Sequence, residues 1–425
     1  MGRRASPAEW NMIVEHLSLK DFRNYAEAEL ELRPGPNVLV GRNGQGKTNL
    51  AEAIAYLATL GSHRVSADAP LVLEGKDAAF IRARLAHGER RVTLELQVNK
   101  QGSNKARIGG SPVRTNELPR YAQVVLFAPE DLQIVRGDPS SRRRFADQLL
   151  VQRTPRMSAV LGDYDRTLRQ RTALLKSARA RGMKNAQLPT LDVWDDKLVA
   201  LGSEIIDARA RLAQDLASPV AEAYAAIAGE DHRPQLEWAL SVRGGDPESS
   251  EVAQGGAATR SGATAELFRS ALQERRAAEL ERGLTLVGPH RDDLLLRVRG
   301  LPVKGYASHG ESWSVALALR LASAELLRAE SPGGDPVLIL DDVFAELDAD
   351  RRARLAGVVA GYEQVLVTAA VAGDVPEALR ANAVRIEAGR VLGTLSDHPL
   401  ERPEAMSPAA PAPAGDDARS ADGDA

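Results

Sequence analysis

The hydrophobic and polar positions of this chain change their period along its length. Apolar and polar residues alternate from Ile13 to Leu19, as they do in half-buried strands. The same alternation returns in Ile81–Leu85 and Val92–Val98. Asn37–Val40 and Val124–Phe127 are short apolar runs typical of buried strands. The first third of the chain therefore predicts a sheet that is antiparallel in large part.

From about Ser141 the spacing becomes helical. Apolar residues then recur at steps of four and three, at Trp194, Leu198, Leu201, Ile205, Ala208 and Leu212. This is the spacing of an a/d seam between helices. Because the seam is shorter than three heptads, it favours a short antiparallel helical arm, and a small helical bundle is the alternative.

The strand pattern resumes after Gly283. We expect strands over Leu284–Val287 and Leu294–Val298 and a helix over Ser312–Leu327. Buried strands are expected at Pro336–Leu340 and Gln364–Thr368, followed by a closing hairpin.

These patterns divide the chain into a head made from both ends and an inserted helical arm. The expected parts are a disordered extension (1–12), the first part of the head (13–140), the arm (141–283, with a flexible loop at 244–264), the second part of the head (284–396) and a disordered acidic tail (397–425).

Charge is unevenly distributed between these parts. Residues 141–185 hold twelve Arg and Lys against three Asp, a net charge of +9, whereas residues 397–425 have a net charge of −5. Cysteine is absent, which excludes disulfides and thiol catalysis and fits a reducing cytoplasm. No apolar run approaches the length of a membrane span, so no membrane partner is expected.

A glycine-rich loop follows the apolar run Asn37–Val40. It has the pattern G-x-x-x-x-G-K-[ST] and comprises Gly41, Arg42, Asn43, Gly44, Gln45, Gly46, Lys47 and Thr48. Glycines let the backbone N–H groups surround phosphates, and the following helix adds its positive N-terminal end. Lys47 would reach the β- and γ-phosphates of ATP, and Thr48 would hold Mg²⁺.

The run 337–340 ends in two acids, Asp341 and Asp342. We expect Asp341 to contact Mg²⁺ directly or through water, and Asp342 to polarise the attacking water. Taken alone, this is equally a buried strand that ends in solvated acids. The loop and the acids are 300 residues apart, from 41 to 341, which indicates a large insertion between them.

Ser308 and Glu311 match a capping box at the start of the helix expected at Ser312–Leu327. A cap explains these two residues but leaves Gly310 unexplained. In ABC-type ATPases a Ser-x-Gly-Gln/Glu turn at this place is the signature motif, which contacts the γ-phosphate held by the partner subunit. The class also places a D-loop where Ala345–Asp348 lie and a switch residue where Thr368 lies, although its usual histidine is absent here.

Further motifs resemble the RecF family of bacterial DNA replication and repair ATPases, which are related to SMC proteins. They are Leu17–Tyr25 with its Phe-Arg-Asn-Tyr, Phe127–Leu132 with Val135–Gly137 and Arg142–Phe145, Gly288–Asp293, and Tyr306–Glu311. The resemblance covers Ile13 to Leu395. It implies an α/β fold with an ABC-type P-loop ATPase head, a mixed sheet with flanking helices and an inserted α-helical arm.

The resemblance also implies a function. Such proteins dimerise around two ATP molecules, hydrolyse ATP slowly, bind double-stranded DNA or junctions with single strands, and act with RecO and RecR in gap repair. Net charge favours the basic segment as the DNA surface, with Arg142, Arg143, Arg144, Arg166, Arg169 and Arg171 as candidate contacts, whereas a solvated basic helix is the alternative. Two other functions stay open: an ATPase subunit of a membrane transporter, and a structural DNA binder without significant hydrolysis.

Overall fold

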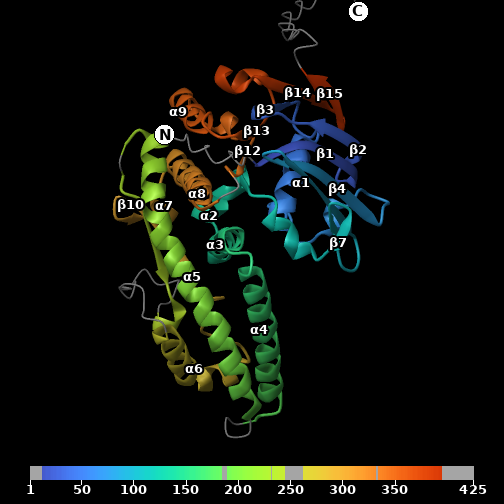
Figure 1. Cartoon of the computed structure of the whole chain (residues 1–425). Helices are drawn as coiled ribbons and strands as arrows, with labels where there is room; N and C mark the ends of the chain where they lie inside the picture. The colour runs from blue at the N-terminus through green and yellow to red at the C-terminus, as the bar shows by residue number, and fades with distance from the viewer. Residues whose placement is uncertain (1–11, 184–188, 231, 245–261, 332–333, 395–425) are drawn as a thin grey trace, which may run out of the picture.

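The chain forms a head of two large sheets and an arm of helices that extends from it (Figure 1). In this computed structural model, the structure describes residues 12–183, 189–230, 232–244, 262–331 and 334–394. Strands from both ends of the described chain build the head, and the arm lies between them in the sequence. The predicted fold class, a mixed α/β head with a helical insertion, is confirmed.

The first sheet of the head is antiparallel and has the order β2-β1-β4-β5-β6-β7. Its strands are β1 (Met12–Phe22), β2 (Tyr25–Glu31), β4 (Ala78–His87), β5 (Arg90–Asn99), β6 (Lys105–Ile108) and β7 (Ser111–Val113). Leu17 and Leu19 of β1 are buried, whereas Ser18 between them is only partly buried, as the alternation predicts. Met12 was expected in the N-terminal extension, but it pairs with His87 and is buried, so that boundary is wrong by one residue.

The second sheet is parallel except for its last hairpin and has the order β15-β14-β3-β13-β12-β8. Its strands are β3 (Gly35–Val40), β8 (Val124–Phe127), β12 (Val337–Asp341), β13 (Gln364–Ala369), β14 (Asn382–Glu387) and β15 (Arg390–Thr394). Every residue of β12 and β13 is buried, because both faces of a parallel sheet are covered. Ile339 packs into the core on the α1 side, and Leu340 packs into the core on the α8 side.

Helix α1 (Lys47–Thr59) lies between the two sheets, and α8 (His309–Glu330) covers the other face of the parallel sheet (Figure 1). Helix α9 (Ala349–Val359) also lies on that side. Short helices α2 (Leu132–Arg136) and α3 (Pro139–Arg153) lead from the head toward the arm.

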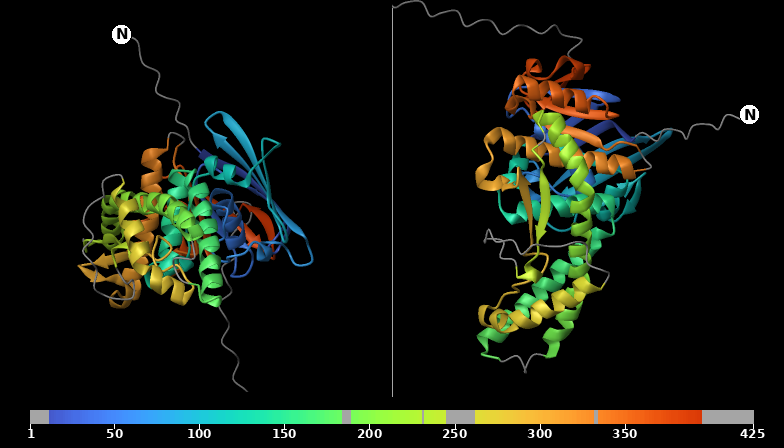
Figure 2. Two further views of the ribbon diagram at one scale, coloured as in Figure 1. Left: turned by 90° about the horizontal axis from the view of Figure 1, so that it is seen from below. Right: turned by 90° about the vertical axis from the view of Figure 1, so that its left-hand side faces the viewer.

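The arm consists of α4 (Met157–Ala180), α5 (Pro189–Ala228) and α6 (Ala263–Arg282). At 1.5 Å per residue, α5 is about 60 Å long, so it spans both the arm and the head. Its seam residues Leu198, Ile205 and Leu212 are buried, and the long arm is seen in the right-hand view of Figure 2. The helix after the expected loop 244–264 begins at Ala263, two residues earlier than expected.

The boundary expected between residues 283 and 284 does not separate arm from head. Strand β9 (Gln235–Ala239), inside the predicted helical arm, pairs with β10 (Asp293–Val298), which in turn pairs with β11 (Leu301–Pro302). The expected strand Leu284–Val287 is wrong, since this segment is a loop in which Leu284 is exposed. The expected 1–11 extension, most of the flexible loop (245–261) and the acidic tail lie outside the described residues.

Candidate functional site

The phosphate loop lies where β3 ends and α1 begins. Gly44 (φ 82°) and Gly46 (φ 113°) take the left-handed conformation that glycine adopts most readily. A Cβ at Gly46 would lie 2.5 Å from the Tyr25 hydroxyl, so this position has no room for another side chain. The sequence pattern therefore reflects a real constraint on the backbone at the start of α1.

Lys47 is the first residue of α1, and its side chain turns back over the loop. Its Nζ donates to the carbonyl oxygens of Gly41 (2.6 Å) and Arg42 (3.2 Å). Burial lowers the pKa of Lys47, while the nearby carboxylates of Asp342 and Asp341 act in the opposite direction. The loop thus encloses a cation at the place where the phosphates of a nucleotide would lie.

The acids of β12 meet the loop at the carboxyl edge of the parallel sheet. The Thr48 hydroxyl donates to Asp341 Oδ1 at 3.0 Å, and the Thr368 hydroxyl donates to the same oxygen at 2.6 Å. The backbone N–H of Asp342 donates to Thr368 Oγ1 at 2.9 Å, and Asp342 has a φ of 54°, which is uncommon for a residue other than glycine. Thr48, Asp341 and Thr368 come from three distant segments and form one cluster.

The oxygens in this cluster fit a magnesium ion. Mg²⁺ prefers oxygen ligands about 2.1 Å away in octahedral geometry, so neighbouring ligands lie about 3 Å apart. The 3.0 Å between Thr48 Oγ1 and Asp341 Oδ1 matches that separation. Burial raises the pKa of Asp341, and the hydrogen bonds from Thr368 and Thr48 oppose that shift.

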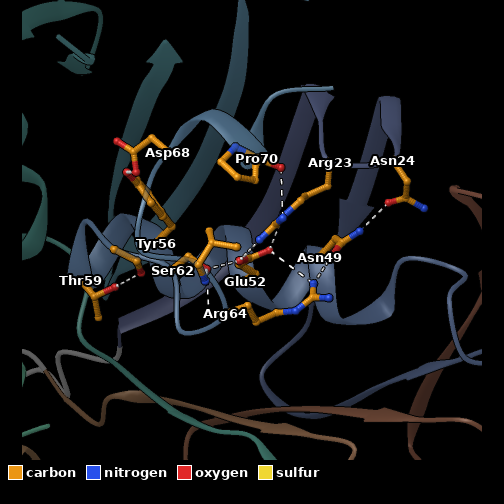
Figure 3. A network of polar contacts seen from close by, with 12 residues as sticks. Arg23, Asn24, Asn49, Glu52, Tyr56, Thr59, Ser62, Arg64, Asp68 and Pro70 are labelled. Carbon is orange, nitrogen blue, oxygen red and sulfur yellow. Dashed lines mark hydrogen bonds and ion pairs between the residues drawn. The ribbon is translucent and has the colours of Figure 1, made fainter. Parts of the chain in front are cut away.

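A polar network supports α1 just behind the loop (Figure 3). Glu52 lies one turn after Thr48, is fully buried, and accepts two hydrogen bonds from Arg23 at 2.7 and 2.8 Å and one from Ser62. Burial alone would raise the pKa of Glu52, but the hydrogen bonds from Arg23 and Ser62 prevail and the pKa is lowered. Arg23 belongs to the Phe-Arg-Asn-Tyr motif, so this motif anchors the helix that carries Lys47 and Thr48.

The loop after α1 brings two residues that the sequence did not single out. Arg64 donates to Asn49 Oδ1 at 2.9 Å, beside the phosphate loop (Figure 3). The buried Nε2 of His63 has no hydrogen-bond partner within the described part of the chain. Burial lowers the pKa of His63, and the carboxylates of Glu130, Glu52 and Asp341 oppose that shift. In the sequence, only Glu52 could have indicated that polar residues gather here, because a carboxylate inside an apolar helix face requires a partner.

The expected signature turn begins α8. Ser308 caps the helix, with Glu311 N–H donating to Ser308 Oγ at 3.2 Å and Ser308 N–H donating to Glu311 Oε2 at 2.9 Å. The capping box is therefore present, whichever further role Ser308 has. Gly310 lies beside the Arg351 guanidinium, 2.8 Å from where a Cβ would be, and that guanidinium pairs with Asp348 of the expected D-loop. Among the described residues, no hydrogen bond or ion pair joins Ser308 or Gly310 to the phosphate loop.

The basic segment is largely neutralised by acids from elsewhere in the chain. Arg171 is fully buried and binds Asp195 and Glu279, each at 2.6 Å. Arg142 is 6% exposed and binds Asp293 at 2.6 Å. Neither side chain can reach DNA, so the prediction of DNA contact is wrong for these two arginines, for the physical reason that a buried guanidinium requires an internal carboxylate.

The other four candidate arginines lie closer to solvent. Arg143 is half-buried and donates to the carbonyl of Asp292 at 2.8 Å, and Arg144 donates to the carbonyl of Ser62 at 2.9 Å. Arg166, 67% exposed, pairs with Asp163 one turn earlier on α4, and Arg169 is exposed. These four remain as candidate DNA contacts.

A groove of about 530 Å³ separates α1 from the start of the arm. Its lining includes residues 58–61 at the end of α1 and, from α3, Arg143, Arg144, Asp147 and Gln148. The groove therefore places two of the remaining arginines beside the segment that follows the nucleotide-binding helix.

The motif Gly288–Asp293 ties the arm to the head. Asp292 accepts hydrogen bonds from the N–H and the hydroxyl of Ser241, each at 2.8 Å, and its neighbour Asp293 binds Arg142. Burial raises the pKa of Asp292 to about 6, and its Oδ2 has no partner among the described residues. A Cβ at Gly288 (φ 128°) would lie 2.6 Å from the Tyr164 hydroxyl, so the backbone here packs directly against α4.

Comparisons with known proteins agree with this architecture. The model of the RecF/RecN/SMC N terminal domain matches residues 13–391. The chain is 58% identical to the DNA replication and repair protein RecF of Clavibacter sepedonicus, over 96% of this chain and 99% of that protein. It is 52% identical to the RecF protein of Streptomyces avermitilis, over 89% and 99%.

A solved structure shares the whole fold. It is described as the recombination mediator protein RecF with ATP in the RecFOR pathway, and it matches with a TM-score of 0.80 and 27% identity, over 91% of this chain and 99% of that chain. None of the helices in the described ranges is long and apolar enough to cross a membrane. The chain therefore belongs to the RecF family of DNA replication and repair proteins, an ATP-binding branch of the SMC-like ATPases.

Proposed function

We propose that this protein is an ATP-gated dimeric clamp that binds DNA in replication and recombinational gap repair. One observation carries the proposal: the phosphate loop, Asp341 and Thr368 form one cluster, while no hydrogen bond among the described residues joins Ser308 to that cluster. A second copy is the simplest source of a serine for the open side of the site. The names of the RecF relatives and of the ATP-bound structure support the choice of DNA and ATP.

The loop would bind ATP through its backbone and through Lys47. Its ammonium group donates to two carbonyl oxygens of the loop. When ATP binds, charged phosphate oxygens would take the place of these neutral acceptors. Thr48 and Asp341 would hold Mg²⁺, which when bound neutralises phosphate charge. The first turn of α1 adds unpaired N–H groups that point toward the phosphates.

Asp342 is the candidate general base. It follows the strand directly, and the Thr368 hydroxyl fixes its backbone at 2.9 Å. Its carboxylate would accept a hydrogen bond from the water that attacks the γ-phosphate. Aspartate is one methylene shorter than the glutamate common at this place in ABC-type ATPases. The shorter reach is consistent with slow hydrolysis that opens a switch.

Ser308 would complete the site of the partner copy. It begins α8, a long helix whose N-terminal end carries partial positive charge. Its hydroxyl lies beside that end, so a γ-phosphate could accept hydrogen bonds from the serine and from the first N–H groups of the helix. The dimer would close when ATP is bound and open once the phosphate has left.

For the DNA surface we propose Arg143, Arg144, Arg166 and Arg169. The first two line the groove beside α1, and the last two are exposed on α4. None of these residues belongs to a motif that reads base edges, so the expected ligand is duplex DNA or a junction bound through its phosphates. RecO and RecR are the proposed partners, since the solved RecF structure is described within the RecFOR pathway.

The test is the size of the protein in solution, measured by light scattering with ATP, with ADP and without nucleotide, each with and without a gapped duplex. We expect a dimer with ATP alone or with ATP and DNA, and a monomer in the other states. A protein that stays monomeric with a non-hydrolysable ATP analogue at high concentration would contradict the clamp.

Release of phosphate separates a switch from a structural DNA binder. We expect slow release that DNA accelerates, and an Asp342→Asn variant that still dimerises with ATP but releases almost no phosphate. If the wild-type protein and this variant release phosphate at the same rate, Asp342 is not the base.

A further inference from the structure

Helix α2 lies beside α8 (Figure 1), and Arg136, its last residue, contacts the first turn of α8. The Nε of Arg136 donates to the Ser312 hydroxyl at 3.0 Å, although the two residues are 176 positions apart in the sequence. Ser312 in turn donates to the carbonyl oxygen of Ser308 at 2.8 Å. The guanidinium of Arg136 is therefore fixed to the same helix end that carries Ser308.

The two terminal nitrogens of this guanidinium have no acceptor among the described residues. The polar atom beside them is His309 Nδ1, which lies 3.4 Å from Nη1. The indole N–H of Trp313 donates to the other ring nitrogen, His309 Nε2, at 2.9 Å. A neutral imidazole that accepts at Nε2 carries its proton on Nδ1, so it has no lone pair there for Arg136. Both ends of the guanidinium can therefore donate to a ligand.

The charge of Arg136 is also not balanced by a carboxylate, in contrast to two other arginines near this helix end. Arg299 forms an ion pair with Glu311, and Arg351 forms one with Asp348 at 2.8 Å. Arg136 is exposed and forms no ion pair within the described ranges of the chain. A positive charge thus stands beside the start of α8 with no internal partner.

We propose that Arg136 binds the γ-phosphate of the ATP held by the partner copy, together with Ser308. This inference rests on the two-molecule site of the proposed function and adds to it a residue outside the phosphate loop, the acidic strand and the signature turn. Two parallel N–H groups of one guanidinium match two oxygens of a phosphate. Ser308 and the first N–H groups of α8 are neutral donors, so Arg136 is the charge that the second molecule brings to the transition state.

The position of α2 raises the alternative that Arg136 binds the nucleotide of its own molecule. The chain passes from β8, which pairs with the strand of Asp341, through a short turn at Pro129–Asp131 into α2. The bond to Ser312 favours the partner's nucleotide, because it fixes the guanidinium at the helix end of Ser308. Within the described residues, no hydrogen bond leads from Ser308 to the phosphate loop of the same molecule.

Arg136 contributes hydrogen bonds and charge and transfers no proton, since a guanidinium stays protonated in proteins. The attacking water still loses its proton to the general base, and the γ-phosphate leaves as inorganic phosphate. Loss of Arg136 should therefore slow hydrolysis without weakening the binding of ATP to a single molecule, which uses the phosphate loop.

The first experiment measures phosphate release at saturating ATP. Arg136→Ala should lower the rate by about 10²- to 10³-fold, as for the loss of one preorganised donor. Arg136→Lys should recover part of that loss, because lysine keeps the charge but lacks the planar pair of donors. Gln133→Ala is the matched control, at an exposed residue of the same short helix, and should stay within about twofold of the wild type.

A mixture of two variants shows which molecule supplies the arginine. When Lys47→Ala and Arg136→Ala are mixed in equal amounts, half of the dimers are mixed. If Arg136 acts on the partner's nucleotide, one site of each mixed dimer carries neither lesion, and the mixture should recover roughly a quarter of the wild-type rate. If Arg136 acts within its own molecule, every site that keeps Lys47 lacks Arg136, and the mixture stays inactive.

A second readout needs no hydrolysis. The chain contains no cysteine, so Arg136→Cys introduces a single thiol. A non-hydrolysable ATP analogue should slow the reaction of this thiol with Ellman's reagent by about tenfold or more, because the closed interface excludes the reagent. The thiol of Lys76→Cys, at an exposed lysine of the head, should react equally fast with and without the analogue.

The outcomes separate this inference from the clamp itself. If the wild-type protein stays monomeric with the analogue, as measured by light scattering, the clamp is contradicted and the role of Arg136 is overturned with it. If the wild type dimerises but Arg136→Ala releases phosphate at the wild-type rate, only the role of Arg136 is overturned. The same holds if the mixture with Lys47→Ala stays inactive, or if the Arg136→Cys thiol reacts equally fast in the dimer.

Discussion

The nucleotide site and the basic arm are both rich in charged residues, yet their sequences were informative to different degrees. At the nucleotide site, Lys47, Thr48 and Asp341 lie together as expected from the motifs. In the basic segment 141–185, a net charge of +9 predicted a DNA surface, but Arg171 and Arg142 proved to be buried in ion pairs. The difference is that a motif specifies backbone geometry, whereas a count of charges says nothing about which of them are paired.

The ion pairs of these arginines could not be predicted from residues 141–185 alone, because most of the carboxylates come from outside this segment. One acid that binds an arginine of residues 141–185, Asp163, lies inside the segment. The others lie outside it and are Asp195, Glu204, Asp215, Glu279, Asp293 and Glu330. Most of these acids lie on α5, α6 or α8, which pack against α3 and α4 only in the folded chain. Several arginines of the basic segment thus bind carboxylates of the same chain and are not free to bind DNA.

The largest expected effect concerns the nucleotide site. Lys47→Ala removes the one ammonium group that the loop encloses, so ATP hydrolysis should fall by about 10²- to 10³-fold, as when one preorganised charge donor is lost. The measurement is phosphate release at saturating ATP. The control is Lys76→Ala, at an exposed lysine of the head. Equal rates for both variants would contradict the role of the loop.

The next effect concerns stability of the arm. Arg171→Met leaves Glu279 without its buried partner and leaves Asp195 with Arg276 alone, which should lower the free energy of unfolding by about 3–5 kcal/mol. Arg169→Met, two residues earlier and exposed, should change it by less than about 0.5 kcal/mol. Denaturant titration followed by circular dichroism measures both. If the two variants are equally stable, the buried pairs do not hold the arm.

A smaller effect is expected for DNA. Arg144→Glu combined with Arg169→Glu should weaken duplex binding and reduce the slope of log affinity against log salt by about one for each lost phosphate contact. Arg385→Glu, at an exposed arginine of β14, is the matched control. If the slope equals that of the wild type, Arg144 and Arg169 do not contact the phosphates of DNA.

The smallest effect is a dependence on pH at the junction of arm and head. Burial raises the pKa of Asp292 from 3.8 to about 6, so the folded chain holds a proton there that the unfolded chain has released. This group therefore makes the protein lose stability as the pH rises from about 4 to about 6. Asp292→Asn, which cannot ionise, should flatten the stability curve in that window and be at least as stable as the wild type at pH 7. An unchanged curve, measured by thermal unfolding at each pH, would show that Asp292 is ionised in both states.

The sequence was sufficient for the parts of the fold that have a long or strict pattern. The strands at the edge of the nucleotide site and the helix that Ser308 caps lie within a few residues of their expected positions. It failed for β9, a five-residue strand whose partner β10 begins more than fifty residues later, because so short a run has no distinctive period. It also failed for Leu284–Val287, where an apolar run is a loop that supplies the Thr285 hydroxyl to Arg171.

At the site, sequence patterns did not identify the residues that support the phosphate loop and α1 from the side of the first sheet. Arg23 was noticed as part of a motif, but its bond to Glu52 depends on how β1 and α1 pack. Ser62, His63 and Arg64 follow α1 in a loop without any repeated pattern, and only the fold brings them to the buried face of that helix.

The central claim is that each nucleotide is bound by two molecules, and mixing two variants tests it most directly. Lys47→Ala damages the loop, and Ser308→Arg damages the helix end that should reach the partner. In a mixed dimer, one site carries both lesions and the other carries neither. Each variant alone should therefore hydrolyse almost no ATP, and an equal mixture should recover roughly a quarter of the wild-type rate, because half of the dimers have one intact site. If the mixture stays inactive while both variants remain folded, or if Ser308→Arg alone hydrolyses ATP at the wild-type rate, the two-molecule site is contradicted.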